Sequence, residues 1–544
     1  MDPLGGRLSS APAAPRDPLG EALESRVAAS ERHGRGQYFT PDPLVDLVLS
    51  LVGRPPGPGG SVLDPSCGSG RFLIAAQALW SLEPGLLHGF ETDPAALAAA
   101  AEQLPGAKLS EGDFLAAPRV ADTSLVIGNP PYIRDRGAKR DLYADFIDAS
   151  VAHLVEGGRL ALVLSNAWLD VSYGRRVREQ LLQTCALEWL VESSAERWFP
   201  GVRINTMVLI ARRCSDRQAR EAQPVRFAVV PRPLPAQPET IRTVAQGTLR
   251  PEPAWGPLLR APELYFTLQR RSGPLPLVPL GELAQLHRGF TTNDNAFFYP
   301  PPGAGIESQY LEPLLKSPKR LRSVRGCADD LPERVFLCDR SRQELLDRGD
   351  LGALAWVDRH RPGQRASSWA LPRQSPARLF VVKGTADRFR QPLLDEAVFA
   401  DQQLYSVRSS IDGVDETVLA AVLNSSWCKL SMEMAGRVNF GDGVLWLSLG
   451  DVREQVLVPD LRLSQPDQRA RLARAFQGLP DSRVPGLVGG AGSSEEQLLW
   501  DSAQQTLDAE VGALLGLSAA EQVQLQLALV ERCSTRLRMS GARC

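Results

Sequence analysis

The tetrapeptide Asn129-Pro130-Pro131-Tyr132 combines a side-chain amide, two rigid prolines and an aromatic ring directly after the apolar run SLVIG. The apolar run predicts a buried strand, and two consecutive prolines cannot continue a central strand. We therefore expect the tetrapeptide at the carboxyl end of a strand, which is the edge where open parallel sheets bind ligands. The structural alternative is a loop that ends the strand and partly buries Tyr132.

A second candidate site is the segment VLDPSCGSG at 62–70, in which an apolar run leads into a glycine-containing turn and then into a helical pattern. Gly68 and Gly70 would let the backbone lie close to a nucleoside, and the helix amino terminus would supply free N–H donors. The phosphate-binding patterns GxGxxG and GxxxxGK[ST] are not found in this turn, which disfavours dinucleotides and nucleoside triphosphates. The turn predicts a ligand without a pyrophosphate.

Acidic residues follow the next two apolar runs. Glu91 comes 27 residues after Asp64, and Asp113-Phe114 follows the third run. A carboxylate in the second position can accept hydrogen bonds from ribose hydroxyls, and an acid beside an aromatic ring can bind the amino group and ring of an adenine. Each acid alone is more often a helix cap or a solvated turn residue. Their order along the chain favours a nucleoside site.

Strand-like and helical patterns alternate from Gly60 to about Val230, which predicts an α/β domain with a doubly wound parallel sheet. Beyond it, shorter strand and helix signals predict a mixed α+β domain. The expected organisation is a mobile leader at 1–30, the α/β domain at 31–232, a proline-dense linker at 233–250, the α+β domain at 251–480, a flexible connection at 481–496 and a helical segment at 497–544.

Composition limits the function classes. The chain of 544 residues has 61 basic and 63 acidic residues and 43% hydrophobic residues, so it is an ordinary globular protein in which any basic surface is local. Its eight cysteines include no CxxC pair, which predicts neither a metal site nor a disulfide framework. The amino terminus lacks the apolar core of a secretory signal, and no stretch is apolar enough to span a bilayer. We therefore expect a cytoplasmic protein that does not associate with a membrane.

The order of the blocks Gly36-Gln37-Tyr38-Phe39-Thr40-Pro41, DPSCGSG, Glu91, Asp113-Phe114 and NPPY resembles the N6-adenine DNA methyltransferases of restriction-modification systems. The resemblance covers most of residues 30–212. It implies a Rossmann-like class I methyltransferase domain followed by a target recognition domain, with S-adenosylmethionine as the methyl donor. NPPY is shared with protein and RNA methyltransferases, whereas the QYFTP block is more specific.

The resemblance also assigns cofactor contacts. It places Tyr38, Phe39 and Thr40 near the methionine portion of S-adenosylmethionine, Asp64 near the amino-acid end, Cys67, Gly68 and Gly70 in the turn, Glu91 on the ribose, and Asp113 and Phe114 at the adenine. Asp145 and Phe146 are supporting candidates. Cys67 is expected to be a small packing residue rather than a nucleophile.

The catalytic assignments follow from the chemistry of an exocyclic adenine amine, whose lone pair is delocalised into the ring. The Asn129 side-chain oxygen and the Pro130 carbonyl would accept the two N–H bonds of N6, with Pro131 holding the loop rigid. Tyr132 would stack on a base rotated out of the duplex. Phe199 is either a second stacking aromatic or a core residue at a strand entry. Neither a covalent intermediate nor a metal is required.

Two polar stretches of the second half are candidates for contacts with double-stranded DNA. Arg288, Thr291, Thr292 and Asn293, followed by Asn295, carry donors and acceptors for base edges. Lys316, Lys319, Arg320 and Arg322, followed by Arg325, would contact phosphates. A solvated basic loop is the alternative for this second group.

Two other functions stay open. One is methylation of an RNA base or of a protein glutamine, and the other is a non-catalytic DNA-binding subunit that keeps the fold. Because only about 30 residues precede QYFTP, we expect a modification enzyme whose cognate restriction endonuclease is encoded separately, in a restriction-modification or phage-defence system.

Overall fold

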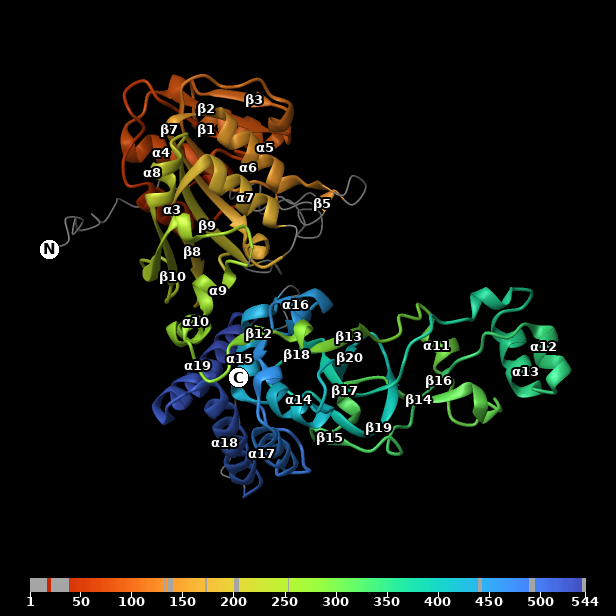
Figure 1. Cartoon of the computed structure of the whole chain (residues 1–544). Helices are drawn as coiled ribbons and strands as arrows, with labels where there is room; N and C mark the ends of the chain where they lie inside the picture. Colours follow the sequence, from red (N-terminus) through yellow and green to blue (C-terminus); the bar gives the residue numbers. More distant parts are fainter. Residues whose placement is uncertain are drawn as a thin grey trace. The chain divides into compact units, whose positions relative to one another are not determined.

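The computed structural model describes residues 17–20, 39–131, 134–135, 140–171, 174–199, 205–252, 254–438, 443–488 and 495–540. The chain divides into two compact units, with Arg260 as the last residue of unit 1 and Ala261 as the first residue of unit 2. In Figure 1 the strands and helices of unit 1 run from red to yellow-green, and those of unit 2 from green to blue. Each unit is described by itself.

Unit 1 contains a sheet of nine strands in the order β11-β10-β8-β9-β7-β4-β1-β2-β3. Strands β3, β2, β1, β4 and β7 are parallel, and β9 is antiparallel to both β7 and β8. The bounds are β1 Ser61–Asp64, β2 Leu87–Glu91, β3 Lys108–Glu111, β4 Thr123–Gly128, β7 Leu154–Ser165, β8 Cys185–Ser193, β9 Thr206–Arg213, β10 Pro224–Val230 and β11 Glu239–Ala245, with a separate two-stranded ladder of β5 Arg134–Asp135 and β6 Arg140–Asp141.

Both faces of this sheet are covered, as its strand sequences require. Successive residues of a strand point to opposite faces, and Val62 and Leu63 of β1 accordingly belong to two different core clusters. The cluster that contains Val62 includes residues of α3 and α4, and the cluster that contains Leu63 includes residues of α6 and α7. The helices are α3 Asp42–Val52, α4 Arg71–Trp80, α5 Pro94–Gln103, α6 Leu142–His153, α7 Arg175–Thr184, α8 Arg217–Ala222 and α9 Gly256–Arg260. The doubly wound α/β architecture is confirmed.

The predicted linker at 233–250 is wrong in its second part. Residues 239–245 form β11, which pairs with β10 and extends the sheet. The prolines that suggested a linker all precede this strand, and the alternating sequence ETIRTVA that follows them is free to join the sheet edge. Unit 1 also continues through α9, where Arg260 is held by the carboxylates of Asp170 and Glu192, both at 2.8 Å.

The predicted mobile leader contains a short segment with a fixed place. Asp17 is fully buried, and it accepts hydrogen bonds from the Ser69 hydroxyl and, at 2.8 Å, from the Gln103 amide. Ser69 lies in the glycine turn that precedes α4, and Gln103 is the last residue of α5. Because a buried carboxylate is stable only with such partners, residues 17–20 are part of unit 1.

Unit 2 is a mixed α+β structure, as expected. Its main sheet has the order β13-β20-β17-β19-β14-β16, with β15 paired to β19, and two small ladders join β12 to β22 and β18 to β21. The bounds are β12 Leu277–Pro279, β13 Ala284–Arg288, β14 Leu311–Leu315, β15 Arg325–Gly326, β16 Arg334–Phe336, β17 Ala377–Val382, β18 Gly384–Thr385, β19 Leu393–Ala400, β20 Leu404–Ser409, β21 Leu445–Trp446 and β22 Leu457–Pro459.

The helices of unit 2 belong to two core clusters, one around the buried residues of α14 and α15 and one that joins α11, α12 and α13 to β14 and β16. The helices are α10 Glu263–Arg270, α11 Asn295–Phe298, α12 Arg342–Arg348, α13 Leu351–His360, α14 Glu416–Leu423, α15 Ser426–Ala435, α16 Leu449–Glu454, α17 Pro466–Gln477, α18 Glu495–Leu515 and α19 Ala519–Met539. The last two occupy the predicted helical segment and share the core of the unit.

The predicted flexible connection at 481–496 is partly anchored. Val484 N–H donates to the Arg322 carbonyl at 3.1 Å, and Leu487 N–H donates to the Asp387 carbonyl at 3.0 Å. Residues 489–494 lie outside the described residues. The glycines that suggested flexibility are concentrated in that undescribed stretch, whereas the residues before it have backbone partners.

No single helix in the described part of the chain is long and apolar enough to cross a membrane. Only the pair α18 and α19 reaches the required length and composition, and the two helices are bent by 116° relative to each other. The same residues contain no group of three or more His, Cys, Asp or Glu side chains arranged to hold a metal ion.

Candidate active site

Four polar segments predicted from the sequence meet at one edge of the sheet in unit 1. Strand β1 ends at Asp64, β2 at Glu91, β3 just before Asp113, and β4 just before Asn129. Because these strands are parallel neighbours in the order β4-β1-β2-β3, their carboxyl ends lie along the same edge. The strand order reverses between β1 and β4, which is the position where α/β sheets open a crevice for a ligand.

The turn after β1 depends on its glycines. Gly68 and Gly70 have φ angles of 53° and 90°, in the left-handed region that favours glycine. The turn is tied to the second strand by a hydrogen bond of 2.9 Å from Cys67 N–H to the Phe90 carbonyl. A second bond of 2.9 Å runs from Gly68 N–H to Glu91 Oε2. The turn and the Glu91 carboxylate therefore form one fixed unit.

Asp64 is almost completely buried at the end of β1. Its Oδ1 atom accepts a hydrogen bond from Ser66 N–H at 3.0 Å, and a Cβ atom at Gly128 would lie only 2.5 Å from that oxygen. Burial raises the pKa of Asp64 to about 8, a shift that the Ser66 N–H opposes and the nearby Glu91 charge reinforces. At neutral pH the carboxyl is therefore protonated, and a cationic group bound beside it would favour its ionisation.

The Glu91 carboxylate is oriented by backbone donors. Oε1 accepts from Thr92 N–H and Asp93 N–H, each at 2.9 Å, while Oε2 accepts from Gly68 N–H. A carboxylate has about four acceptor sites, so Oε2 keeps capacity for a further donor such as a hydroxyl. The ribose contact of Glu91 stays a prediction.

The Asn129 amide is held by the QYFTP block. Its Nδ2 atom donates to the Thr40 hydroxyl at 3.2 Å, and Thr40 is buried, with its carbonyl accepting from Arg71 Nη1 at 2.7 Å. Because the nitrogen of the amide faces Thr40, the Oδ1 atom is directed to the other side. Ser66 Oγ donates to the Asn129 carbonyl at 3.3 Å. These bonds connect three separate sequence blocks at one place.

Asp113 and Phe114 have partners within unit 1. Phe114 is 2% exposed, and its ring stacks on Phe146 at a centroid distance of 5.6 Å and contacts His153 at 4.9 Å. Asp113 is exposed and accepts from Leu115 N–H at 2.9 Å, as the cap of a single helical turn. In this structure Asp113 caps a turn and Phe114 is a core residue. Both roles are structural, and the adenine contact stays a prediction.

Several other predicted residues also have structural partners. Phe199 is 4% exposed and belongs to the core cluster that includes α3 and α4, so the structure shows the core alternative for this residue. Cys67 packs against Gly89, and burial raises the pKa of its thiol well above the usual range. Asp145 binds Arg176 at 3.3 Å on the surface. Tyr38 and Tyr132 lie outside the described residues.

The base-edge candidates of unit 2 divide between exposed and structural positions. Arg288, at the end of β13, and Thr291 and Asn293 are exposed. Thr292 is buried, and its hydroxyl hydrogen-bonds the Asn295 side chain ahead of α11. Thr292 therefore shapes the loop, whereas the first three residues can reach a ligand.

The phosphate candidates after β14 divide in the same way. Lys319 and Arg322 are exposed, and Lys316 lies over the Tyr299 ring at 5.6 Å. Arg320 is paired with Glu333, and the Arg325 guanidinium donates to the carbonyls of Gln477 and Leu479, both at 2.9 Å. The Arg325 side chain therefore anchors the end of α17. The sequence alone does not separate such a structural arginine from one that contacts phosphate.

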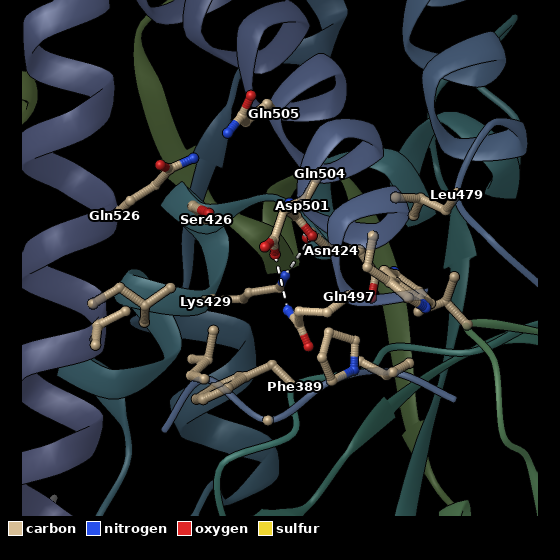
Figure 2. Close-up of a pocket in the computed structure, with 18 residues that line it drawn as sticks. Phe389, Asn424, Ser426, Lys429, Leu479, Gln497, Asp501, Gln504, Gln505 and Gln526 are labelled. Carbon is tan, nitrogen blue, oxygen red and sulfur yellow. Dashed lines mark hydrogen bonds between the residues drawn. The ribbon is translucent and has the colours of Figure 1, made fainter. Parts of the chain in front are cut away.

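A cavity of about 530 Å³ lies in unit 2, between α15 and the two terminal helices (Figure 2). Lys429 reaches into it and donates from Nζ to Gln504 Oε1 at 2.7 Å, and amides of Asn424, Gln497 and Gln526 form part of the wall. The lining contains none of the residues at the strand ends of unit 1. The cavity therefore belongs to the packing of α18 and α19 on α15 and is not part of the candidate active site.

Residues 15–230 match the family model described as N-6 DNA methylase. The match is limited to the part of the chain that forms unit 1. Among curated relatives, the type II methyltransferase M.PaeR7I of Pseudomonas aeruginosa is 27% identical over 243 residues, which are 34% of this chain and 42% of the relative. M.XamI of Xanthomonas campestris pv. amaranthicola is 26% identical over 317 residues, 52% of this chain and 56% of the relative. The chain thus spans about half the length of these relatives.

One solved structure shares the fold of this chain. The type IIL restriction-modification enzyme MmeI, solved in complex with DNA, matches 95% of this chain and 81% of its own length, with a TM-score of 0.59 and 12% sequence identity. At this identity the likeness concerns the fold alone. It extends over both units, although the family model covers only the first.

Proposed function

We propose that the protein transfers a methyl group from S-adenosylmethionine to N6 of an adenine rotated out of double-stranded DNA. The observation that carries this proposal is the Asn129 amide, fixed by Thr40 at the end of β4 and directly beside the strand that ends at Asp64. The match of residues 15–230 to the N-6 DNA methylase family supports the choice of adenine and of DNA. The biological setting proposed is a restriction-modification or phage-defence system with a separately encoded endonuclease.

The strand ends suit S-adenosylmethionine. Glu91 would accept hydrogen bonds from the ribose hydroxyls, and the buried Asp64 carboxyl would ionise beside the ammonium group of the amino-acid end. The left-handed turn at Gly68 and Gly70 brings backbone rather than side chains to this edge. When bound, S-adenosylmethionine supplies an electrophilic methyl group on a sulfonium sulfur.

The chain's own groups would activate the amine. Asn129 Oδ1 and the Pro130 carbonyl accept the two N–H bonds of adenine N6, which favours a tetrahedral nitrogen and stabilises the positive charge that develops on it. Thr40 holds the amide in the orientation that presents Oδ1, so little reorganisation is needed at the moment of reaction. Tyr132 is assigned to stacking on the extrahelical base.

Long-read sequencing of DNA from a methylation-deficient host that expresses the protein tests this function. The proposal predicts N6-methyladenine within one short sequence motif and no such signal in cells with an empty vector. Unmodified DNA together with methylated RNA or methylated protein glutamine would favour the alternative substrates. Specific DNA binding without any methylation would favour the non-catalytic subunit.

Replacing Thr40 by valine is expected to lower the single-turnover methylation rate about fivefold. The change removes the hydroxyl that accepts from Asn129 Nδ2, and one neutral hydrogen bond stabilises a state by about 1 kcal/mol. Thr40→Ser should restore the rate because it keeps the hydroxyl. A loss confined to S-adenosylmethionine affinity, with an unchanged rate at saturation, would show that Thr40 contacts the cofactor and does not position Asn129.

Binding of S-adenosylmethionine should release a proton below pH 8. In the ligand-free protein burial raises the pKa of Asp64 to about 8, so at pH 6.5 the carboxyl is protonated, and a neighbouring cation would lower this pKa and drive ionisation. The affinity should therefore increase as the pH rises towards 8. Calorimetry at pH 6.5 in two buffers of different ionisation enthalpy measures the proton count. Proton release that persists in Asp64→Asn would contradict the assignment.

A further inference from the structure

One end of the main sheet of unit 2 is fixed by backbone hydrogen bonds between its strand ends. Phe290 N–H donates to the Ala400 carbonyl at 2.8 Å, Asp401 N–H to the Leu315 carbonyl at 3.2 Å, and Lys383 N–H to the Gln403 carbonyl at 3.0 Å. These bonds join the ends of β13, β14, β17 and β19 to the start of β20. Side chains that leave this end, which we call the β13–β20 end, are therefore carried by a rigid base.

A glycine permits this convergence. A Cβ atom at Gly289 would lie 2.3 Å from the Asp401 carbonyl oxygen and 2.4 Å from the Ala400 carbonyl oxygen, both backbone atoms. Any larger residue would push the end of β13 away from the turn that leads into β20. Gly289 thus keeps the preceding residue, Arg288, close to that turn.

Three polar residues come together at this end of the sheet. Arg288 of β13 and Val381 of β17 both lie opposite Tyr405 of β20. Lys383 directly follows β17 and Gln403 directly precedes β20, where Lys383 N–H donates to the Gln403 carbonyl at 3.0 Å, and the charge of Arg288 acts on Lys383. Neither Lys383 nor Gln403 belongs to a motif that sequence inspection singles out.

The charges at this end are not balanced within the sheet. Burial, followed by the charge of Arg288, lowers the pKa of Lys383, and Asp401 opposes this effect. Asp401 is itself buried and already accepts from the Tyr299 hydroxyl at 2.8 Å and from Gln403 N–H at 3.1 Å. The positive charges of Arg288 and Lys383 repel each other, and an electron-rich ligand bound beside them would offset this repulsion.

Donors and acceptors are mixed at the β13–β20 end. Thr291 Oγ1 lies 3.4 Å from Gln402 Oε1, and Gln403 is exposed beside them. Phosphates present only acceptors, so amide oxygens gain nothing from facing them. Base edges in the major groove present both kinds of group, and they require the precise placement that strand ends provide.

On the basis of the proposed function, we propose that Arg288, Lys383 and Gln403 read base edges of the target site and determine the recognised sequence. Arg288 and Lys383 would donate to purine acceptors, most effectively to O6 and N7 of guanine, and Gln403 would pair with an adenine edge. The exposed residues Lys319 and Arg322 are left as phosphate contacts. This assigns specificity to Arg288 at the end of β13 and to two residues that flank β17 and β20.

The test compares the methylated motif of Arg288→Gln and Lys383→Gln with that of the wild-type protein, by long-read sequencing and by methylation of oligonucleotides with single base changes. We expect each variant to accept a second base pair at one motif position, with discrimination there reduced about tenfold to a hundredfold. Arg373→Gln is the matched control, because the Arg373 side chain is 98% exposed and the substitution removes the same charge elsewhere in unit 2. Its motif should not change.

Measuring DNA affinity against salt separates base reading from phosphate contact. An unchanged motif, with binding uniformly weaker and the salt slope reduced by about one, would overturn the proposal in favour of phosphate contacts. Variants that behave like Arg373→Gln would overturn it as well. A wild-type protein that methylates no DNA would contradict the proposed function, whereas wild-type methylation with unchanged motifs in the variants contradicts this inference alone.

Discussion

Asn129→Ala is expected to reduce the methylation rate about a hundredfold to a thousandfold while S-adenosylmethionine affinity stays within about twofold. Removing one preorganised polar group that stabilises a developing charge has an effect of this size. The amide is bound to Thr40 and lies in the loop after β4, whereas the proposed ribose contact is made by Glu91 at the end of β2. The measurement is a single-turnover methylation assay together with calorimetric titration of the cofactor.

The control for Asn129→Ala is Gln183→Ala, which removes an amide on the exposed surface of α7, where its partner is Glu179 at 3.5 Å. This control should methylate at the wild-type rate. A thermal unfolding midpoint for Asn129→Ala close to that of the wild type would exclude loss of the fold. Methylation by Asn129→Ala at the wild-type rate would reject the catalytic role of the amide.

Glu91→Gln is expected to weaken S-adenosylmethionine binding about tenfold to a hundredfold, with a smaller effect on the rate at saturating cofactor. Hydrogen bonds to a charged acceptor contribute about 1.5 to 3 kcal/mol. The glutamine keeps one oxygen, which can accept either from Gly68 N–H or from Thr92 N–H and Asp93 N–H, so the variant loses the charge and also part of the backbone bonding. Calorimetry or equilibrium dialysis gives the dissociation constant directly.

Glu111→Gln is the matched control for this experiment. Glu111 lies opposite Glu91 in the register of β2 and β3, and it is exposed at the end of its strand. Its replacement removes the same charge one strand away and should leave the cofactor affinity unchanged. Equal losses in both variants would indicate a general electrostatic effect rather than a ribose contact at Glu91.

The strand ends were predictable because each has a sequence signal. An apolar run followed by an acid, a glycine turn or a proline pair predicts both the strand and its end, and parallel neighbours then bring Asp64, Glu91 and Asn129 to one edge. The register also follows from buried residues on both faces. The α/β domain is therefore readable from local patterns.

Other features depend on contacts between segments that no local pattern reports. Phe114 and Phe199 have the residue types of ligand contacts, but whether such a ring faces a ligand or the core depends on helices packed against it, here α6 and α3. The Asp17 contact with Ser69 and Gln103 joins residues more than 50 positions apart. Lys383 and Gln403 are isolated in sequence and meet Arg288 only through the sheet of unit 2.

The most direct test of the central claim is nucleoside analysis of DNA that has been incubated with the purified protein and S-adenosylmethionine carrying a deuterated methyl group. After enzymatic digestion, mass spectrometry identifies the labelled nucleoside. We expect the label in N6-methyladenine, and only when Asn129 is present. Label in a methylated cytosine, or labelled N6-methyladenine formed equally by Asn129→Ala, would contradict the account.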